Sequence, residues 1–211
     1  MDSLEGHGRR FAELGASASD DGHVRATVVF LGDSNVGFAL TAVAFALTQS
    51  DPAYVIVDVA RAGTGIRSHG AFWKVRLRDV LARVKPDGFV VNLGINDTEA
   101  AGTAATRGYA DYAAKIDWLM GLFPPHMPVW WTNLPCSIEP EDRSIGCRAV
   151  NDALAAGPER WPDLTVLDFA TASLGRHEYL LAHIGGVHLA GPGARAWAHL
   201  VGEALNAHFP A

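Results

Sequence analysis

Residues 26–47 read ATVVFLGDSNVGFALTAVAFAL, and this stretch decides how the rest of the chain is arranged. Its first six residues are apolar and rich in β-branched and aromatic side chains, which is typical of a buried strand. Gly32 and Asp33 break the run, and an apolar segment over 36–47 predicts a helix. Strand, turn and helix meet at Ser34, where the free N–H groups of a helix start favour a developing negative charge.

The tetrapeptide GDSN supports two interpretations when taken alone. Ser34 is either an activated nucleophile on a sharp turn or an ordinary N-cap at a strand-to-helix junction. Residues further along the chain must decide between them.

Strand-like and helix-like segments alternate to the C-terminus. The predicted strands lie at 24–31, 53–59, 89–93, 129–134 and 164–168, and the predicted helices at 36–47, 73–84, 109–122, 149–156 and 194–207. The strands are continuous apolar runs, so both faces of the sheet should be covered by helices. We therefore predict an α/β fold, a three-layer sandwich around a five-stranded parallel sheet.

The domain organisation is simple. Residues 1–22 are predicted to be a flexible lead-in, with a short helix over Phe11–Leu14, and residues 23–211 a single domain. A polar loop is expected over 135–146.

Composition excludes several classes of protein. The 211 residues are 49% hydrophobic and 19% charged, and 17 Lys+Arg against 23 Asp+Glu give a net charge of −6. A general nucleic-acid binder would need clustered basic residues, and a membrane helix would need about 20 apolar residues in succession. The first residues lack a signal-peptide pattern, which favours the cytoplasm, with secretion as the alternative if a leader has been removed. Oligomeric state leaves no mark on the sequence.

Cys136 and Cys147 flank the polar loop and leave two alternatives open. They are either free thiols or a disulfide, and a disulfide would stabilise this acidic loop and indicate an oxidising compartment. No histidine lies between them, so a four-ligand zinc site is not supported.

Unusual loops follow the predicted strands. GDSN follows the first strand, AGTG the second and GIND the third, and GGVHL precedes the last helix. Because parallel strands end at one edge of a sheet, these loops can bring together a nucleophile, amide donors and a base, which acyl transfer needs. Asp33 and Asp97 are expected to hold turns by accepting backbone N–H bonds.

This set of blocks resembles the SGNH (GDSL-like) hydrolase family over nearly the whole chain. The resemblance implies a flavodoxin-like fold, and its four blocks correspond here to Ser34, Gly65, Asn96 and His188. Gly63 is a second candidate for the glycine block.

The resemblance also implies roles for these residues. Ser34 would attack an acyl carbonyl, and His188 would take its proton and return it to the leaving group. The N–H groups of Ser34 and Gly65 and the amide of Asn96 would form the oxyanion hole. No cofactor and no metal are implied.

One position departs from the family pattern. The acid expected three residues before the histidine is replaced by Gly185. Either a Ser–His dyad operates with a backbone carbonyl holding the imidazole tautomer, or an acid such as Asp168 or Glu178 takes its place, or hydrolytic activity has been lost. His183 is a rival base in the same segment.

We therefore expect a serine esterase acting on a small-molecule carboxylic ester with a short acyl chain. The short chain is expected because the sequence has no long insertion that could shelter a fatty chain. The alternatives are an acyltransferase of the same fold and a catalytically inactive ligand-binding domain.

Overall fold

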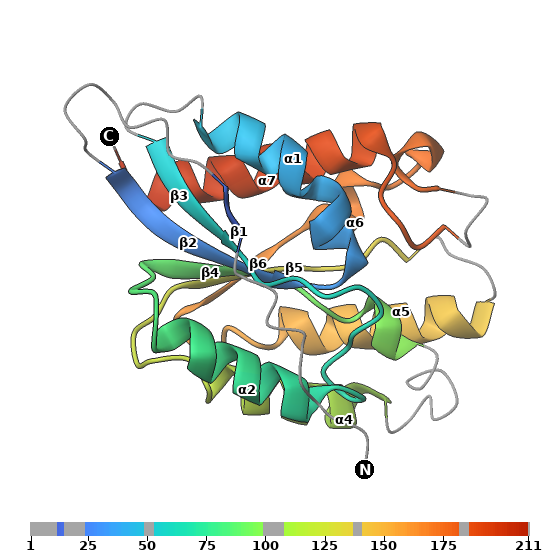
Figure 1. Ribbon diagram of the computed structural model, residues 1–211. Coiled ribbons are helices and arrows are strands. Elements are labelled where there is room, and N and C mark those ends of the chain that lie inside the picture. The colour runs from blue at the N-terminus through green and yellow to red at the C-terminus, as the bar shows by residue number, and fades with distance from the viewer. Residues whose placement is uncertain are drawn as a thin grey trace, which may run out of the picture.

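A six-stranded sheet lies at the centre of the molecule, with helices on both of its faces (Figure 1). The computed structural model describes residues 12–14, 24–48, 53–98, 108–136, 141–181 and 186–210. The strands are β1 (Ala12–Leu14), β2 (Val24–Gly32), β3 (Ala53–Asp58), β4 (Gly88–Asn92), β5 (Val129–Thr132) and β6 (Leu164–Leu167). The helices are α1 (Ser34–Thr48), α2 (Gly70–Leu81), α4 (Gly108–Met120), α5 (Glu141–Ala155), α6 (Phe169–Ala172) and α7 (Gly191–His208), with short 3-10 turns η1 (Ile95–Asp97) and η2 (His177–Tyr179).

Five of the strands are parallel, which confirms the predicted fold. The order across the sheet is β1-β3-β2-β4-β5-β6, and every neighbouring pair from β3 to β6 is parallel. Counted without β1, this is the strand order of flavodoxin-like folds. The order reverses between β2 and β4, and ligand sites in such sheets lie outside the carboxyl ends of the strands at that point.

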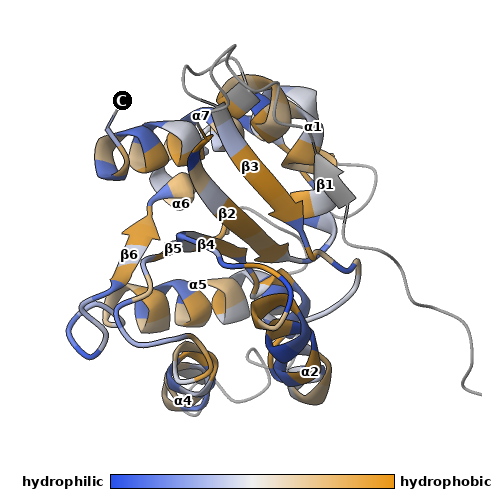
Figure 2. Ribbon diagram, turned by 60° about the vertical axis from the view of Figure 1, so that its left-hand side comes forward, coloured by the Kyte–Doolittle hydropathy of each residue, from blue (hydrophilic) through white to orange (hydrophobic). Residues whose placement is uncertain are grey.

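Two cores, one on each face of the sheet, hold the layers together. Figure 1 shows α1, α6 and α7 on one face and α2, α4 and α5 on the other. One core contains Trp197 of α7 and Phe30 of β2, and the other contains Trp73 of α2 and Trp131 of β5. Figure 2 shows the apolar character of the strands between these layers. Because helices cover both faces of the sheet, the strands are apolar throughout and do not alternate between apolar and polar residues.

The prediction of a short helix over Phe11–Leu14 is wrong. Ala12–Leu14 form β1, which pairs antiparallel with β3 from Ala12 opposite Asp58 to Leu14 opposite Ile56. Three residues carry too little pattern to separate the two states, and the unpaired edge of β3 decides for the strand.

The expected polar loop over 135–146 also needs correction, because α5 already begins at Glu141. Ser144, Cys147, Val150 and Leu154 are buried at helical spacing, and exposed residues lie between them. The exposed positions made the segment look like a loop. Among the described residues, no helix is long and apolar enough to cross a bilayer.

Candidate active site

Ser34 lies at the turn between β2 and α1, as the sequence predicts. A side chain at Gly32 would collide with Val36 and with the backbone of Asn92 on the neighbouring strand β4, so the chain turns where it has no side chain. The helix begins at Ser34 itself, two residues earlier than predicted. The serine is half-buried and is followed by the first turn of a 15-residue helix.

Asp33 joins the serine turn to the loop after β4. Its carboxyl is fully buried and accepts the Asn35 N–H at 2.9 Å and the Asn96 amide at 3.2 Å. Burial raises the pKa of Asp33 from 3.8 to about 7, although both hydrogen bonds oppose the rise. A carboxyl in this position fixes the geometry of the turn, which is the expected role.

Asn96 brings three loops together. It lies in η1, directly after β4, and its amide nitrogen donates to the Thr64 carbonyl at 3.0 Å as well as to Asp33. Thr64 belongs to the loop after β3 and Asp33 to the loop after β2. The predicted oxyanion donor is therefore held at the point where the strand order reverses.

Gly65 packs directly against the carboxyl of Asp97. A Cβ at Gly65 would overlap that carboxyl, which accepts the N–H groups of Ile66 at 2.8 Å and Arg67 at 3.2 Å. Gly63, the other candidate, is exposed, and a Cβ added there would meet no atom within 4 Å. Close approach to the site therefore distinguishes Gly65.

The Gly65 N–H has a hydrogen-bond partner within the protein. It donates to Nδ1 of His69 at 3.4 Å, and the Ser68 hydroxyl lies 2.7 Å from the same nitrogen. A substrate oxygen at this N–H would share or replace a long hydrogen bond.

His188 reaches the same edge through the side chain of Asn35. The Asn35 amide nitrogen donates to the Val187 carbonyl at 2.9 Å, and its oxygen accepts the Leu189 N–H at 3.0 Å. The imidazole of His188 also meets the ring of Phe38, one helical turn after Ser34, edge to face at 5.3 Å between centroids. The predicted base and nucleophile are thus attached to the same turn of α1.

The imidazole of His188 has no carboxylate partner within the described segments. Its Nδ1 is buried and forms no hydrogen bond there, so the backbone carbonyl expected to hold the ring in a Ser–His dyad is not found among the described residues. Burial lowers the pKa of His188 below its ordinary 6.5, and the positive charge of Arg143 on α5 lowers it further. The ring is therefore neutral at pH 7 and able to accept a proton.

The acids considered as replacements bind elsewhere. Asp168 caps α6, where it accepts the Thr171 N–H at 3.1 Å and the Asn133 amide at 2.8 Å, and these bonds lower its pKa. Glu178 is exposed and lies 3.9 Å from the Arg176 guanidinium. His183 and Gly185 lie outside the described residues.

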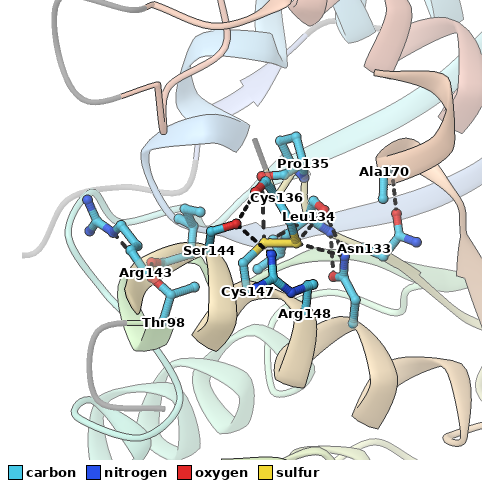
Figure 3. Close-up of a disulfide and its surroundings, with 12 residues drawn as sticks. Thr98, Asn133, Leu134, Pro135, Cys136, Arg143, Ser144, Cys147, Arg148 and Ala170 are labelled. Atoms are coloured by element: carbon cyan, nitrogen blue, oxygen red, sulfur yellow. Dashed lines mark hydrogen bonds between the residues drawn. A yellow bond between two sulfur atoms is a disulfide. The ribbon is translucent and has the colours of Figure 1, made fainter. Parts of the chain in front are cut away.

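Figure 3 shows that Cys136 and Cys147 form a disulfide, which ties the loop after β5 to α5. Asn151 reinforces this link, because its side chain binds both the N–H and the carbonyl of Leu134 at 2.8 Å. Cys136 also lines a hollow of about 370 Å³ that includes Gly186, two residues before His188. The disulfide therefore lies beside the loop of the predicted base.

A smaller hollow of about 280 Å³ opens beside Ser34. Gly37, Ala60 and Ala62 line it together with Asp33, Phe38 and Asp58. Its small side chains leave space next to the serine. Within the described segments, no cluster of His, Cys, Asp and Glu could hold a metal ion.

Sequence reasoning missed Asn35 and Arg143. The signal for Asn35 is a polar residue directly before the predicted apolar helix, at the position that is leucine in a G-D-S-L motif. For Arg143 no signal existed, because its segment was expected to be a loop. The roles of Ser34, His188, Gly65 and Asn96 stay predictions that the geometry accommodates.

Comparisons with known proteins identify a sequence family and a fold. The sequence family described as "Protein of unknown function (DUF459)" matches residues 27–201. No curated protein matches the chain.

Several solved structures share its fold. The catalytic domain of peptidoglycan O-acetyltransferase A from Streptococcus pneumoniae is 18% identical, with 88% of this chain and 95% of that chain covered and a TM-score of 0.64. A family 3 carbohydrate esterase from Clostridium thermocellum is 15% identical, with coverages of 87% and 98% and a TM-score of 0.66. A member of the lipolytic G-D-S-L family from Veillonella parvula is 16% identical, with coverages of 84% and 96% and a TM-score of 0.64. The chain therefore has the fold of SGNH and GDSL hydrolases.

Proposed function

This chain belongs to the family described as "Protein of unknown function (DUF459)", and since that description names no activity, we propose from the site itself that the protein is a serine esterase. One observation carries the proposal. The residue next to Ser34 binds the backbone on both sides of His188, so a nucleophile and a neutral base are attached to one turn.

In the proposed reaction, Ser34 Oγ attacks the carbonyl carbon of the ester. His188 accepts the serine proton, and because Nδ1 is buried, Nε2 is the nitrogen that exchanges it. The protonated imidazole then donates this proton to the departing alcohol, which leaves an acyl group on Ser34. Water attacks the acyl-enzyme with His188 again acting as base, and the carboxylic acid is released.

The tetrahedral intermediate carries a negative oxygen that needs hydrogen-bond donors. We assign this role to the N–H groups of Ser34 and Gly65 and to the amide of Asn96. The second and third donors have internal partners in the free protein, so the oxyanion would share or replace those bonds. Such donors contribute most when they are already oriented before the charge develops.

A short acyl chain fits the space beside Ser34. The hollow there is about 280 Å³, and Gly37, Ala60 and Ala62 line it together with the larger Asp33, Phe38 and Asp58, which leaves room for a small group. Two proteins of the same fold are a peptidoglycan O-acetyltransferase and a carbohydrate esterase, and both names are compatible with a small acyl group.

Acyl transfer to an acceptor other than water is the second candidate function. It is favoured by the similarity in fold to the peptidoglycan O-acetyltransferase, and it would use the same acyl-enzyme. Nδ1 of His188 has no partner among the described residues, which favours a third candidate, a ligand-binding domain without turnover.

The test is hydrolysis of p-nitrophenyl acetate and butyrate by the wild type, Ser34→Ala and His188→Ala. We expect turnover that falls to the background in both variants, with the acetate preferred. His126→Ala serves as the matched control, because His126 lies between α4 and β5 and away from the site, and it should retain the wild-type rate. When a sugar alcohol is added as acceptor, transfer is detected as the ester of that alcohol, whereas hydrolysis releases only the free acid.

If the wild type is folded but shows no turnover, the next experiment is labelling with a fluorophosphonate. If Ser34 is labelled, the site is competent and model esters are poor substrates. An unlabelled Ser34 contradicts the esterase proposal and favours the binding domain.

A further inference from the structure

Among the described residues, the loop that carries His188 is joined to α1 by hydrogen bonds from the side chain of Asn35. The backbone of this loop is also bound to the segment before it, because the His188 carbonyl accepts the Leu181 N–H at 2.8 Å and the Ala190 N–H donates to the Tyr179 carbonyl at 2.7 Å. The two hydrogen bonds of Asn35, to the Val187 carbonyl and the Leu189 N–H, join residues more than 150 positions apart in the sequence. The side chain is 5% exposed, so these bonds are shielded from water. Losing hydrogen bonds of a buried side-chain amide costs more free energy than losing exposed ones.

The imidazole has little else that orients it. In a Ser-His-Asp triad, a carboxylate on Nδ1 holds the ring in one orientation and tautomer. Here Nδ1 has no partner among the described residues, and the Phe38 ring makes an edge contact only. The direction of the ring therefore depends on where the backbone at residue 188 is held.

Asn35 links that backbone to the turn that carries the nucleophile. Its own N–H is bound by the Asp33 carboxyl at 2.9 Å, so Asp33, Ser34 and Asn35 form one fixed turn. A leucine at this position, as in a G-D-S-L motif, could make neither of the two bonds to the histidine loop.

We propose that Asn35 is a positioning residue that holds His188 from its backbone, in place of a carboxylate that holds the imidazole. The proposal rests on the proposed esterase function for its kinetic consequences, but not for its structural ones. It explains how a histidine without the usual acid could keep a fixed distance from Ser34.

The kinetic consequence is a loss in kcat with little change in KM. Asn35 touches no substrate in this assignment, and misplacement of a reacting group by about 1 Å can reduce the rate about 100-fold. We therefore expect Asn35→Ala to lower kcat for p-nitrophenyl acetate about 100-fold and to change KM less than threefold.

Asn35→Asp gives a sharper signature. The introduced carboxylate can accept the Leu189 N–H but repels the Val187 carbonyl, whereas its protonated form can donate to that carbonyl. Burial and the neighbouring Asp33 both raise the pKa of the introduced group. Activity of this variant relative to wild type should therefore rise as the pH falls, with at least a tenfold gain between pH 8 and pH 5.

Asn151→Ala is the matched control. Asn151 also binds a backbone N–H and a backbone carbonyl at 2.8 Å, but it holds Leu134 and not the histidine loop. It should cost similar stability while leaving kcat and its pH profile within threefold of wild type. Thermal unfolding of every variant at each assay pH shows whether the protein compared is folded.

A second measurement needs no turnover. NMR titration of the His188 ring gives its pKa directly, and burial and Arg143 on α5 hold that pKa below 6.5 in the wild type. Release of the loop in Asn35→Ala should move the pKa back toward 6.5, and Asn151→Ala should leave it unchanged.

These two measurements separate the proposals. An unchanged His188 titration in folded Asn35→Ala overturns the positioning role, whatever the kinetics are. A shifted titration in a protein whose wild type cleaves no ester supports the positioning role and contradicts the esterase. Equal losses of kcat in the Asn35 and Asn151 variants, without a shift, mean that Asn35 is only structural.

Discussion

The loops that carry Ser34 and Asn96 differ from the loop that carries His188 in what holds them. On the serine side, the buried carboxyls of Asp33 and Asp97 accept hydrogen bonds from four N–H donors in three neighbouring loops. On the histidine side, the neutral amide of Asn35 and backbone hydrogen bonds to Tyr179 and Leu181 hold the loop, and Nδ1 of the imidazole has no partner among the described residues.

The difference shows that the two halves of the candidate site should respond to different perturbations. The serine side depends on the ionisation of buried acids and should change with pH. The position of the histidine loop depends on the Asn35 amide and on backbone hydrogen bonds, none of which titrates, so it should change with substitution and with the loops around it. The following experiments test this contrast, from the largest expected effect to the smallest.

The largest effect should come from the pH dependence of stability that Asp33 contributes. Its pKa in the folded protein is about 7 against an ordinary 3.8, so the folded state binds the proton more tightly. Its contribution to the free energy of unfolding is therefore greatest below pH 4 and falls by roughly 4 kcal/mol as the pH rises through 7.

Urea unfolding of wild type and Asp33→Asn at pH 4 and pH 8 measures this contribution. We expect the variant to lose less stability than wild type between the two pH values. An equal change in the free energy of unfolding for the two proteins between pH 4 and pH 8 would show that Asp33 does not make stability depend on pH.

Asn96→Ala should have the next largest effect, a loss of catalysis. Loss of one oxyanion donor typically lowers kcat by about 10²–10³, or about 2.7–4 kcal/mol. Single-turnover acylation by p-nitrophenyl acetate isolates this step. Asn133→Ala removes an asparagine that bridges Asp168 and Ala170 at the same sheet edge, and it should keep the rate within tenfold. Comparable losses of acylation rate in both variants would show that the effect comes from disturbed loops and not from a lost oxyanion donor.

Removal of the disulfide should cost stability but little activity. The bond closes a loop of 11 residues, and replacing Cys136 and Cys147 by serine should lower the free energy of unfolding by about 2–3 kcal/mol. Turnover at 25 °C should change less than threefold. A large loss of kcat at full folding would instead show that α5, through Arg143, positions the histidine side.

The smallest effect is expected for Asp168→Asn. Because Asp168 caps α6 and does not reach His188, activity should stay within about threefold of wild type, with a stability cost of about 1 kcal/mol. A loss of a thousandfold in folded protein would make Asp168 the missing acid and remove the contrast between the two sides.

The sequence predicts most of the fold because its strands are apolar and its turns contain Gly and Pro. The sequence does not predict the start of α5, since its exposed positions resemble a loop and the first buried residue of its face, Ser144, is polar. β1 was missed because its three residues form a strand only through pairing with β3.

The candidate site divides in the same way. Ser34 and Asn96 follow predicted strands, so topology alone places them at one edge. The role of Asn35 depends on a contact with Val187 that is 152 residues distant, and no local pattern encodes it. The unusual pKa of Asp33 likewise follows from burial, which the letters GDSN do not reveal.

The short strand β1 has a consequence for how the protein behaves in concentrated solution. It covers the outer side of β3 at residues 56–58, and no other described segment pairs with that edge. An uncovered strand offers its N–H and carbonyl groups to the equivalent strand of a second molecule. A chain shortened to begin at Val24 should therefore keep its parallel sheet but self-associate, and β1 would act as a guard against aggregation.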